Sequence, residues 1–268
     1  MTFFSVNNLT TSYGKHTILF SLSFDVEVGT TVGILGANGS GKTTLLKSIG
    51  GILPHNGTCR LNGEILENKS PKELAKLCSY IPQRSGISID ISVLDTVLMG
   101  FYPYLGFLEH PSTEMRKKAM EMIELVGLAG RENMNYLHLS EGQKQLCILA
   151  RTLVTNSRLL LLDEPESALD FHYRYQTLEL LRNWNKNKQS TSLISLHDPI
   201  LALNTCDKLL LLQDGKTASV IYPKTDSLGD MEKKLRLIYG DVSLHYCTNK
   251  NGKRQLIMLK ENFCENAN

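Results

Sequence analysis

The chain has 268 residues, enough for one large domain or for a domain with a smaller subdomain. Hydrophobic residues make up 42% of it and charged residues 21%, a balance that supports a packed core and argues against disorder. The formal net charge of +2 is close to neutral, so a general basic surface for nucleic acid is not indicated.

The sequence is not expected to contain a signal peptide or a membrane span. The start, MTFFSVNNL, lacks the basic flank and long apolar run of a signal peptide. No window approaches the roughly 18–20 apolar residues that a membrane span needs. The leucine runs at 159–162 and 209–212 are short and bounded by polar residues, so we expect buried strands there. The sequence therefore predicts a soluble, cytoplasmic protein.

The cysteines are scattered and form no CxxC pair; they stand at positions 59, 78, 147, 206, 247 and 264. Several lie in apolar stretches such as LCIL and KLCSY. This pattern favours small core residues in a reducing compartment over disulfides or metal ligands.

Strands are expected over 3–13, 17–28 and 31–36, the last running into a glycine-rich loop that continues as the helix TTLLKSIGGIL. TCRLNGEIL is typical of a hairpin with Asn62-Gly63 as its turn. A short helix over 71–77 begins after Ser70 and leads into the strand CSYIP.

From about 84 to 155 the pattern becomes helical, with apolar residues at three-to-four spacing in SVLDTVLMG, PSTEMRKKAMEMIELVGL and EGQKQLCILARTLV. Strands return at RLLLLDEP and STSLISLHDP, with a helix over 170–187 between them. This alternation indicates a parallel sheet. KLLLLQDGKTASVI predicts two strands joined by an Asp-Gly turn, DMEKKLRLIYG predicts a helix, and the polar end NFCENAN is expected to fray.

The stretch GANGSGKTT matches GxxxxGK[ST] between a predicted strand and a predicted helix, the context that a phosphate-binding loop requires. Its backbone N–H groups and helix dipole would stabilise phosphate charge, Lys42 would reach the β- and γ-phosphates, and the Thr43 hydroxyl would bind Mg²⁺. The predicted nucleotide-binding residues are Gly36, Ala37, Asn38, Gly39, Ser40, Gly41, Lys42, Thr43 and Thr44.

RLLLLDEP supplies two carboxylates after a buried strand. In phosphate-loop enzymes such a strand holds an Asp near Mg²⁺, which predicts that role for Asp163. Glu164 is then placed to polarise a water that attacks the γ-phosphate.

A second anion site is indicated by HLSEGQKQL, where Ser140 and Gly142 stand at the start of an amphipathic helix. A hydroxyl residue and a glycine there would leave helix N–H groups free for phosphate. One chain thus carries two phosphate-binding features almost a hundred residues apart.

Together these motifs resemble the ATP-binding subunits of ABC transporters over roughly residues 3–220. LSEGQ looks like the family signature, usually LSGGQ, and SALD (167–170) resembles the loop that crosses the dimer interface. YIPQ places Gln83 at the glutamine that senses Mg²⁺ and touches the membrane partner, and SLHDP places His197 at the histidine that contacts the γ-phosphate. Tyr13 matches the aromatic that stacks on adenine.

The resemblance implies an α/β phosphate-loop ATPase with a mixed or parallel sheet, an antiparallel β subdomain and an inserted helical subdomain over about 84–155. It implies a nucleotide-binding domain over 1–222 and a C-terminal extension over 223–268. Ser140, Gly142 and Gln143 would complete the ATP site of a second copy, so that two ATP molecules are sandwiched in a homodimer. Mg²⁺ would be held by Thr43, Gln83 and Asp163, with Glu164, His197 and Gln83 as catalytic residues.

The partners implied are membrane permease subunits at the cytoplasmic face of a bacterial or archaeal membrane, with a substrate-binding protein acting indirectly and no nucleic acid. ISVLDTVLMGFYPYLG, ALDFHYRYQTLELL and the tail KLRLIYGDVSL are similar to importers of iron–siderophore, haem or cobalamin. Zinc and manganese importers share the VLDTVLMG part and remain an alternative. A non-transport ABC ATPase is a further alternative, which the single cassette without a heptad run disfavours. A small-molecule kinase is another, but it would not require LSEGQ or His197.

Two residues depart from the family pattern and put the turnover rate in question. Glu141 replaces the usual glycine of the signature, and its side chain is expected to point away from phosphate. Glu166 stands where threonine or serine is common. The aromatics at 101, 102, 104 and 107 are expected to form an exposed apolar patch that receives a partner's short helix, unless they pack inside the helical subdomain.

Overall fold

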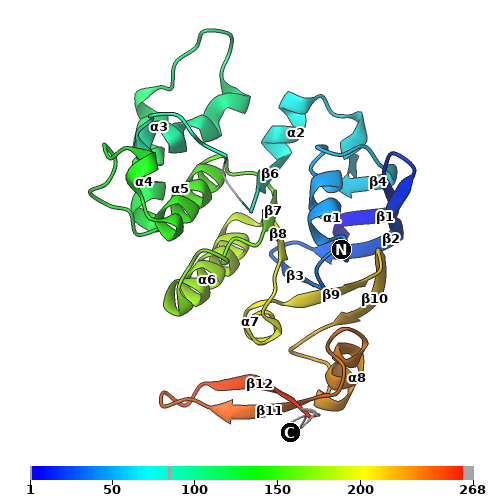
Figure 1. Cartoon of the computed structure of the whole chain (residues 1–268). Helices are drawn as coiled ribbons and strands as arrows, with labels where there is room; N and C mark the ends of the chain where they lie inside the picture. The colour runs from blue at the N-terminus through cyan, green and yellow to red at the C-terminus, as the bar shows by residue number, and fades with distance from the viewer. Residues whose placement is uncertain (1, 84–85, 262–268) are drawn as a thin grey trace, which may run out of the picture.

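The computed structural model describes residues 2–83 and 86–261, and its centre is a mixed six-stranded sheet in the order β10-β9-β3-β8-β7-β6 (Figure 1). All neighbouring strands are parallel except β10, which pairs antiparallel with β9. The strands are β3 (Thr31–Leu35), β6 (Cys78–Ile81), β7 (Leu159–Asp163), β8 (Thr191–Ser195), β9 (Lys208–Gln213) and β10 (Lys216–Ile221). The parallel sheet is confirmed, and both leucine runs are fully buried strands.

A four-stranded antiparallel sheet lies beside the central one, in the order β2-β1-β4-β5. Its strands are β1 (Thr2–Tyr13), β2 (His16–Glu27), β4 (Asn56–Leu61) and β5 (Glu64–Ile65), and the short 3₁₀ helix η1 (Leu66–Asn68) follows. Asn62 and Gly63 have φ values of 50° and 85°, the left-handed pair that a tight hairpin turn requires. The predicted hairpin is therefore confirmed.

Helix α1 (Lys42–Ile49) follows β3 and is packed between the two sheets, with Leu45, Leu46 and Ile49 in their common core. It ends four residues before the predicted end. Gly50 and Gly51 follow Ile49, and Gly51 has a left-handed φ of 69°, which stops the helix. Helix α2 (Pro71–Leu77) begins as predicted, with Ser70 and Glu73 forming a reciprocal capping box.

The inserted helical region comprises α3 (Val93–Leu98), η2 (Met99–Tyr104), α4 (Thr113–Leu125), η3 (Tyr136–His138) and α5 (Glu141–Val154). Figure 1 shows it projecting away from α1 and the antiparallel sheet. The predicted exposure of Phe101 is wrong, because this ring is only 6% exposed and belongs to the core under α5. Tyr102, Tyr104 and Phe107 are exposed as expected.

Helix α6 (Phe171–Lys188) connects β7 to β8, and α7 (Pro199–Thr205) connects β8 to β9. The C-terminal region contains the predicted helix, α8 (Leu228–Tyr239), and a hairpin that the sequence analysis did not predict. That hairpin consists of β11 (Val242–Thr248) and β12 (Arg254–Lys260). Asn204 of α7 exchanges two hydrogen bonds with the backbone of Leu256, and Leu244 and Leu256 belong to the main core. This hairpin is therefore anchored on the body of the central domain.

Four of the described cysteines are buried thiols, as predicted: Cys59, Cys78, Cys147 and Cys206. Cys247 is exposed on β11, which corrects the expectation of a core residue, and Cys264 and the end NFCENAN lie outside the described residues. Among the helices of the described part, none combines the length and the apolar character needed to cross a membrane.

Candidate functional site

The loop between β3 and α1 forms a glycine-lined cradle. Gly39 and Gly41 have φ values of 80° and 104°, in the region that favours glycine, and a Cβ on Gly36 would lie 2.4 Å from the carbonyl oxygen of Leu212. Lys42 Nζ donates to the carbonyl oxygens of Gly36 at 2.8 Å and Ala37 at 3.2 Å. The ammonium group thus folds back over the loop that precedes it.

Two observations indicate that this cradle suits a phosphate. The Ser40 hydroxyl oxygen is buried and has no hydrogen-bond partner among the described residues. Burial lowers the pKa of Lys42, while the carboxylates of Glu164 and Asp163 oppose this shift. A bound phosphate would supply the acceptor that Ser40 lacks and the negative charge that a partly desolvated Lys42 favours.

Asp163 is the last residue of β7, and its carboxylate faces the first turn of α1. The Thr43 hydroxyl donates to Asp163 Oδ1 at 3.0 Å, and the Ser195 hydroxyl donates to the same oxygen at 2.7 Å. A hydroxyl and a carboxylate side by side are hard oxygen ligands of the kind that Mg²⁺ prefers. The Thr43 and Asp163 side chains therefore fit this ion.

The Glu164 carboxylate is held between two side chains that follow the neighbouring strands β6 and β8. Gln83 Nε2 donates to Glu164 Oε2 at 2.6 Å, and His197 Nε2 is hydrogen-bonded to Glu164 Oε1. The Glu164 backbone has a φ of 52°, a left-handed conformation that is costly for a residue with a side chain. The structure thus brings Gln83 and His197 to Glu164, although they lie 81 and 33 residues from it in the sequence.

Ser195 is a site residue that the sequence analysis missed. It is fully buried at the end of β8, paired in register with Asp163, and its hydroxyl accepts from the Glu164 backbone N–H at 2.9 Å. One hydroxyl therefore fixes both carboxylate residues. The available signal was a polar residue at the end of a buried strand, two positions before His197.

Tyr13 ends β1 with 47% of its surface exposed. Burial raises the pKa of Tyr80, and Asp163 and the nearby Tyr13 raise it further. The exposed Tyr13 ring is available for a stacking contact.

Within one chain, the predicted second half-site, at the start of α5, does not meet the phosphate loop at the start of α1. Ser140 caps α5, accepting from the Gln143 backbone N–H at 3.3 Å, while Gln143 Oε1 accepts from the Ser140 N–H at 3.1 Å. A Cβ on Gly142 would lie 3.2 Å from the carbonyl oxygen of Ala168, so this helix start lies against the SALD loop. Helix α1 packs on β1, β2, β7 and β8, whereas α5 packs on α3, α4, η2 and β6 (Figure 1).

The two unusual glutamates differ in environment. Glu141 is exposed and forms an ion pair with Lys144 at 2.7 Å, so its carboxylate is engaged away from the helix start. Glu166 is 3% exposed, and its Oε2 atom has no partner among the described residues. Burial and the neighbouring charge of Glu164 raise the pKa of Glu166 to about 7, although backbone N–H groups and Arg174 oppose the shift.

Glu166→Gln is expected to stabilise the fold in alkaline but not in acidic solution. The folded chain keeps the Glu166 proton up to a pKa of about 7, against 4.5 for the ordinary side chain. The folded state therefore binds more protons in this window and loses stability as pH rises through it. The difference corresponds to about 3 kcal/mol in the free energy of unfolding at pH 8. Urea unfolding at pH 5 and pH 8 checks this, with exposed Glu141→Gln as control, and an equal effect at both pH values would contradict it.

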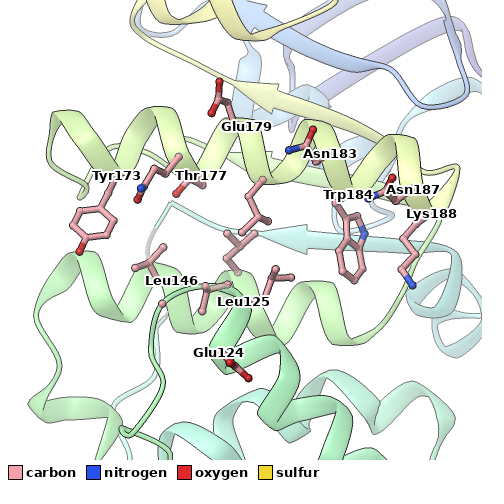
Figure 2. A pocket seen from close by; sticks show the side chains of 15 residues that line it. Glu124, Leu125, Leu146, Tyr173, Thr177, Glu179, Asn183, Trp184, Asn187 and Lys188 are labelled. Carbon is pink, nitrogen blue, oxygen red and sulfur yellow. The ribbon is translucent and has the colours of Figure 1, made fainter. Parts of the chain in front are cut away.

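A groove of about 670 Å³ lies away from the carboxylate site, between α6 and the α4–α5 part of the helical region (Figure 2). Leu125, Leu146 and Trp184 line it. It contains none of the predicted nucleotide or metal residues.

Comparison with known proteins identifies the family of this chain. Residues 19–167 match the family model described as ABC transporter. The chain is 37% identical over 214 residues to a probable iron chelatin transport ATP-binding protein of Helicobacter pylori, covering 79% of this chain and 84% of that protein. It is 34% identical to a haemin import ATP-binding protein of Deinococcus radiodurans, covering 91% and 94%. It is 35% identical to a manganese transport system ATP-binding protein of Synechocystis, covering 78% and 80%.

Solved structures agree with this. An inward-facing putative metal-chelate type ABC transporter matches with a TM-score of 0.81 and 25% identity, covering 97% of this chain and 99% of that chain. A bacterial ABC transporter cassette solved as a dimer matches with a TM-score of 0.74 and 25% identity, covering 82% and 98%. Proteins of this kind thus work in transporter complexes and dimerise. The chain belongs to the ABC transporter family, as one of its ATP-binding proteins, and is an ABC transporter ATPase.

Proposed function

We propose that this ATPase powers uptake of an iron chelate or haem-type substrate through a membrane permease, as a peripheral homodimer at the cytoplasmic face. The observation that carries the hydrolytic part is the Glu164 carboxylate, held by Gln83 and His197 beside the Thr43–Asp163 pair. The cargo class is supported by the names of the iron-chelatin and haemin relatives and by the sequence stretches shared with that group.

The phosphates of ATP are bound by the loop from Gly36 to Thr44, with Lys42 Nζ turning from its two carbonyl partners to the β- and γ-phosphates. Tyr13 stacks on the adenine. Thr43 and Asp163 would hold Mg²⁺, with Gln83 close to it, and the bound ion would neutralise phosphate charge.

Glu164 acts as the general base for hydrolysis. Its carboxylate takes a proton from a water while the water oxygen attacks the γ-phosphorus, and the bond to the leaving ADP oxygen breaks. Gln83 and His197 orient the carboxylate, and Ser195 holds the backbone N–H of Glu164. His197 also contacts the γ-phosphate. The base is thus positioned from three strand ends before ATP arrives.

Ser140, Gly142 and Gln143 act on the ATP held by the other copy. Their position on α5, away from α1, supports an active site shared between two subunits. Since the γ-phosphate contacts both copies, ATP favours the closed dimer and hydrolysis favours separation. This opening and closing is the conformational change transmitted to the permease.

A chromosomal deletion of the gene tests the proposed function. In cells of the source organism we expect the deletion to abolish energy-dependent uptake of labelled iron–siderophore or haemin, and the wild-type chain to restore it. The chain carrying Glu164→Gln should fail to restore uptake. Loss of manganese or zinc uptake alone would favour the alternative that the manganese relative represents, and unchanged uptake of all these substrates would contradict the proposal.

A further inference from the structure

Three potential metal-ligating side chains converge outside the ATP site, in the antiparallel subdomain. They are His55, in the loop after α1, Cys59, on β4, and Glu67, in η1. Their ligand atoms all lie within 4.8 Å of one another. His55 Nε2 lies 2.9 Å from Glu67 Oε1 and 3.8 Å from Cys59 Sγ.

From this convergence we propose that His55, Cys59 and Glu67 form a binding site for a Zn²⁺-like divalent transition metal, with solvent as the fourth ligand. A thiolate, an imidazole and a carboxylate are the three ligand types that zinc takes in proteins. Alkaline-earth ions, by contrast, prefer oxygen ligands alone.

The observed distances are close to those of tetrahedral coordination. Zinc bond lengths place sulfur and nitrogen ligands about 3.5 Å apart and nitrogen and oxygen ligands about 3.4 Å apart. The Sγ–Nε2 distance therefore needs to shorten by about 0.3 Å and the Nε2–Oε1 distance to lengthen by about 0.5 Å. Small side-chain rotations suffice, because the Glu67 side chain is 27% exposed.

The surroundings support a held but accessible ion. Cys59 is fully buried and the His55 side chain is only 8% exposed, so two ligands are fixed by packing. Glu67 Oε1 also accepts from the Cys59 backbone N–H at 2.7 Å, which orients the carboxylate toward the cysteine. A groove of about 590 Å³ that His55 and Glu67 help to line gives access for a water ligand.

Metal binding replaces a proton at the cysteine. Burial, and secondarily Glu67, raise the pKa of the Cys59 thiol, so the metal-free side chain is protonated at neutral pH. On binding, the S–H bond breaks, a sulfur–metal bond forms and one proton passes to the buffer. The bound ion would join the loop after α1 to β4 and η1, at the opposite end of α1 from Lys42.

Titration of the full, metal-stripped chain with Co²⁺ as a spectroscopic probe tests the site, in a phosphine reductant and without chelators. We expect a near-ultraviolet thiolate-to-cobalt charge-transfer band that saturates at one ion per chain and that Zn²⁺ abolishes. Cys59→Ser should lose this band, whereas Cys247→Ser, which removes an exposed thiol elsewhere, should keep it. Co²⁺ bound at Thr43 and Asp163 gives no thiolate band and is thereby distinguished.

Glu67→Gln keeps the prediction testable if Cys59→Ser fails to fold, since Glu67 lies at the surface and glutamine still accepts from the Cys59 N–H. We expect Co²⁺ affinity to fall by more than about tenfold, since even residues that only support metal ligands cost about 10–100-fold when replaced. A wild-type chain without the band, a band that persists in Cys59→Ser, or unchanged affinity in Glu67→Gln would overturn the proposal.

Discussion

Glu164→Gln is expected to lower the ATP turnover number by about 10²–10⁴-fold while ATP affinity stays unchanged. Glutamine keeps the size of the side chain and one acceptor oxygen, so the hydrogen bonds with Gln83 and His197 need only partial rearrangement. It cannot take a proton from the attacking water. The expected variant therefore binds ATP and closes on it but does not release phosphate.

Steady-state phosphate release and equilibrium nucleotide binding measure the two parts of this prediction separately. Glu114→Gln provides the matched control, because Glu114 is an exposed carboxylate on α4, outside every proposed site, that forms an ion pair with Lys118. Its turnover should stay close to that of the wild type. Full turnover in Glu164→Gln would show that another group activates the water.

Ser140→Arg is expected to abolish turnover without weakening the binding of ATP to the isolated subunit. Ser140 caps α5 in the helical region, while the phosphate loop leads into α1, and the two helices pack in separate core clusters. An arginine at that helix start would obstruct the phosphates of an ATP held by the second copy. Loss of the cap itself costs only about 1 kcal/mol, which leaves the fold intact.

Lys42→Ala is the contrasting variant for this test. It removes the ammonium group that reaches the phosphates, so ATP affinity itself should fall by about 10–100-fold, the value of a hydrogen bond to a charged group. The two variants are thus distinguished by ATP affinity, which falls in Lys42→Ala and stays unchanged in Ser140→Arg. Reduced ATP affinity in Ser140→Arg, at the level of Lys42→Ala, would place both motifs in one site of a single chain.

The sequence predicted the central fold, and which side chains lie together at the candidate site, because both depend on local patterns. GANGSGKTT predicts a loop and the first turn of a helix. The buried runs at 159–162 and 209–212 alternate with helical segments, and this alternation is typical of a parallel sheet. Once those strands are parallel, Asp163 at the end of one strand, and Glu164 and His197 just after two strands, lie at the edge of the sheet where the carboxyl ends meet.

The residues that were missed or misplaced depend on tertiary packing. Ser195 became visible only when β8 was paired with β7 in register, since an isolated serine at a strand end carries no motif. Phe101 belongs to a stretch with several aromatics, and nothing local distinguishes the one ring that turns under α5. The β11–β12 hairpin is stabilised by Asn204, about fifty residues earlier, a contact that the sequence does not announce.

ATP-dependent dimerisation of the Glu164→Gln chain, followed by light scattering, tests the central claim most directly. The account predicts that ATP with Mg²⁺ doubles the mass, that ADP does not, and that adding Ser140→Arg to the same chain prevents the doubling. A chain that binds ATP but forms the dimer equally well with Ser140→Arg would contradict the shared site.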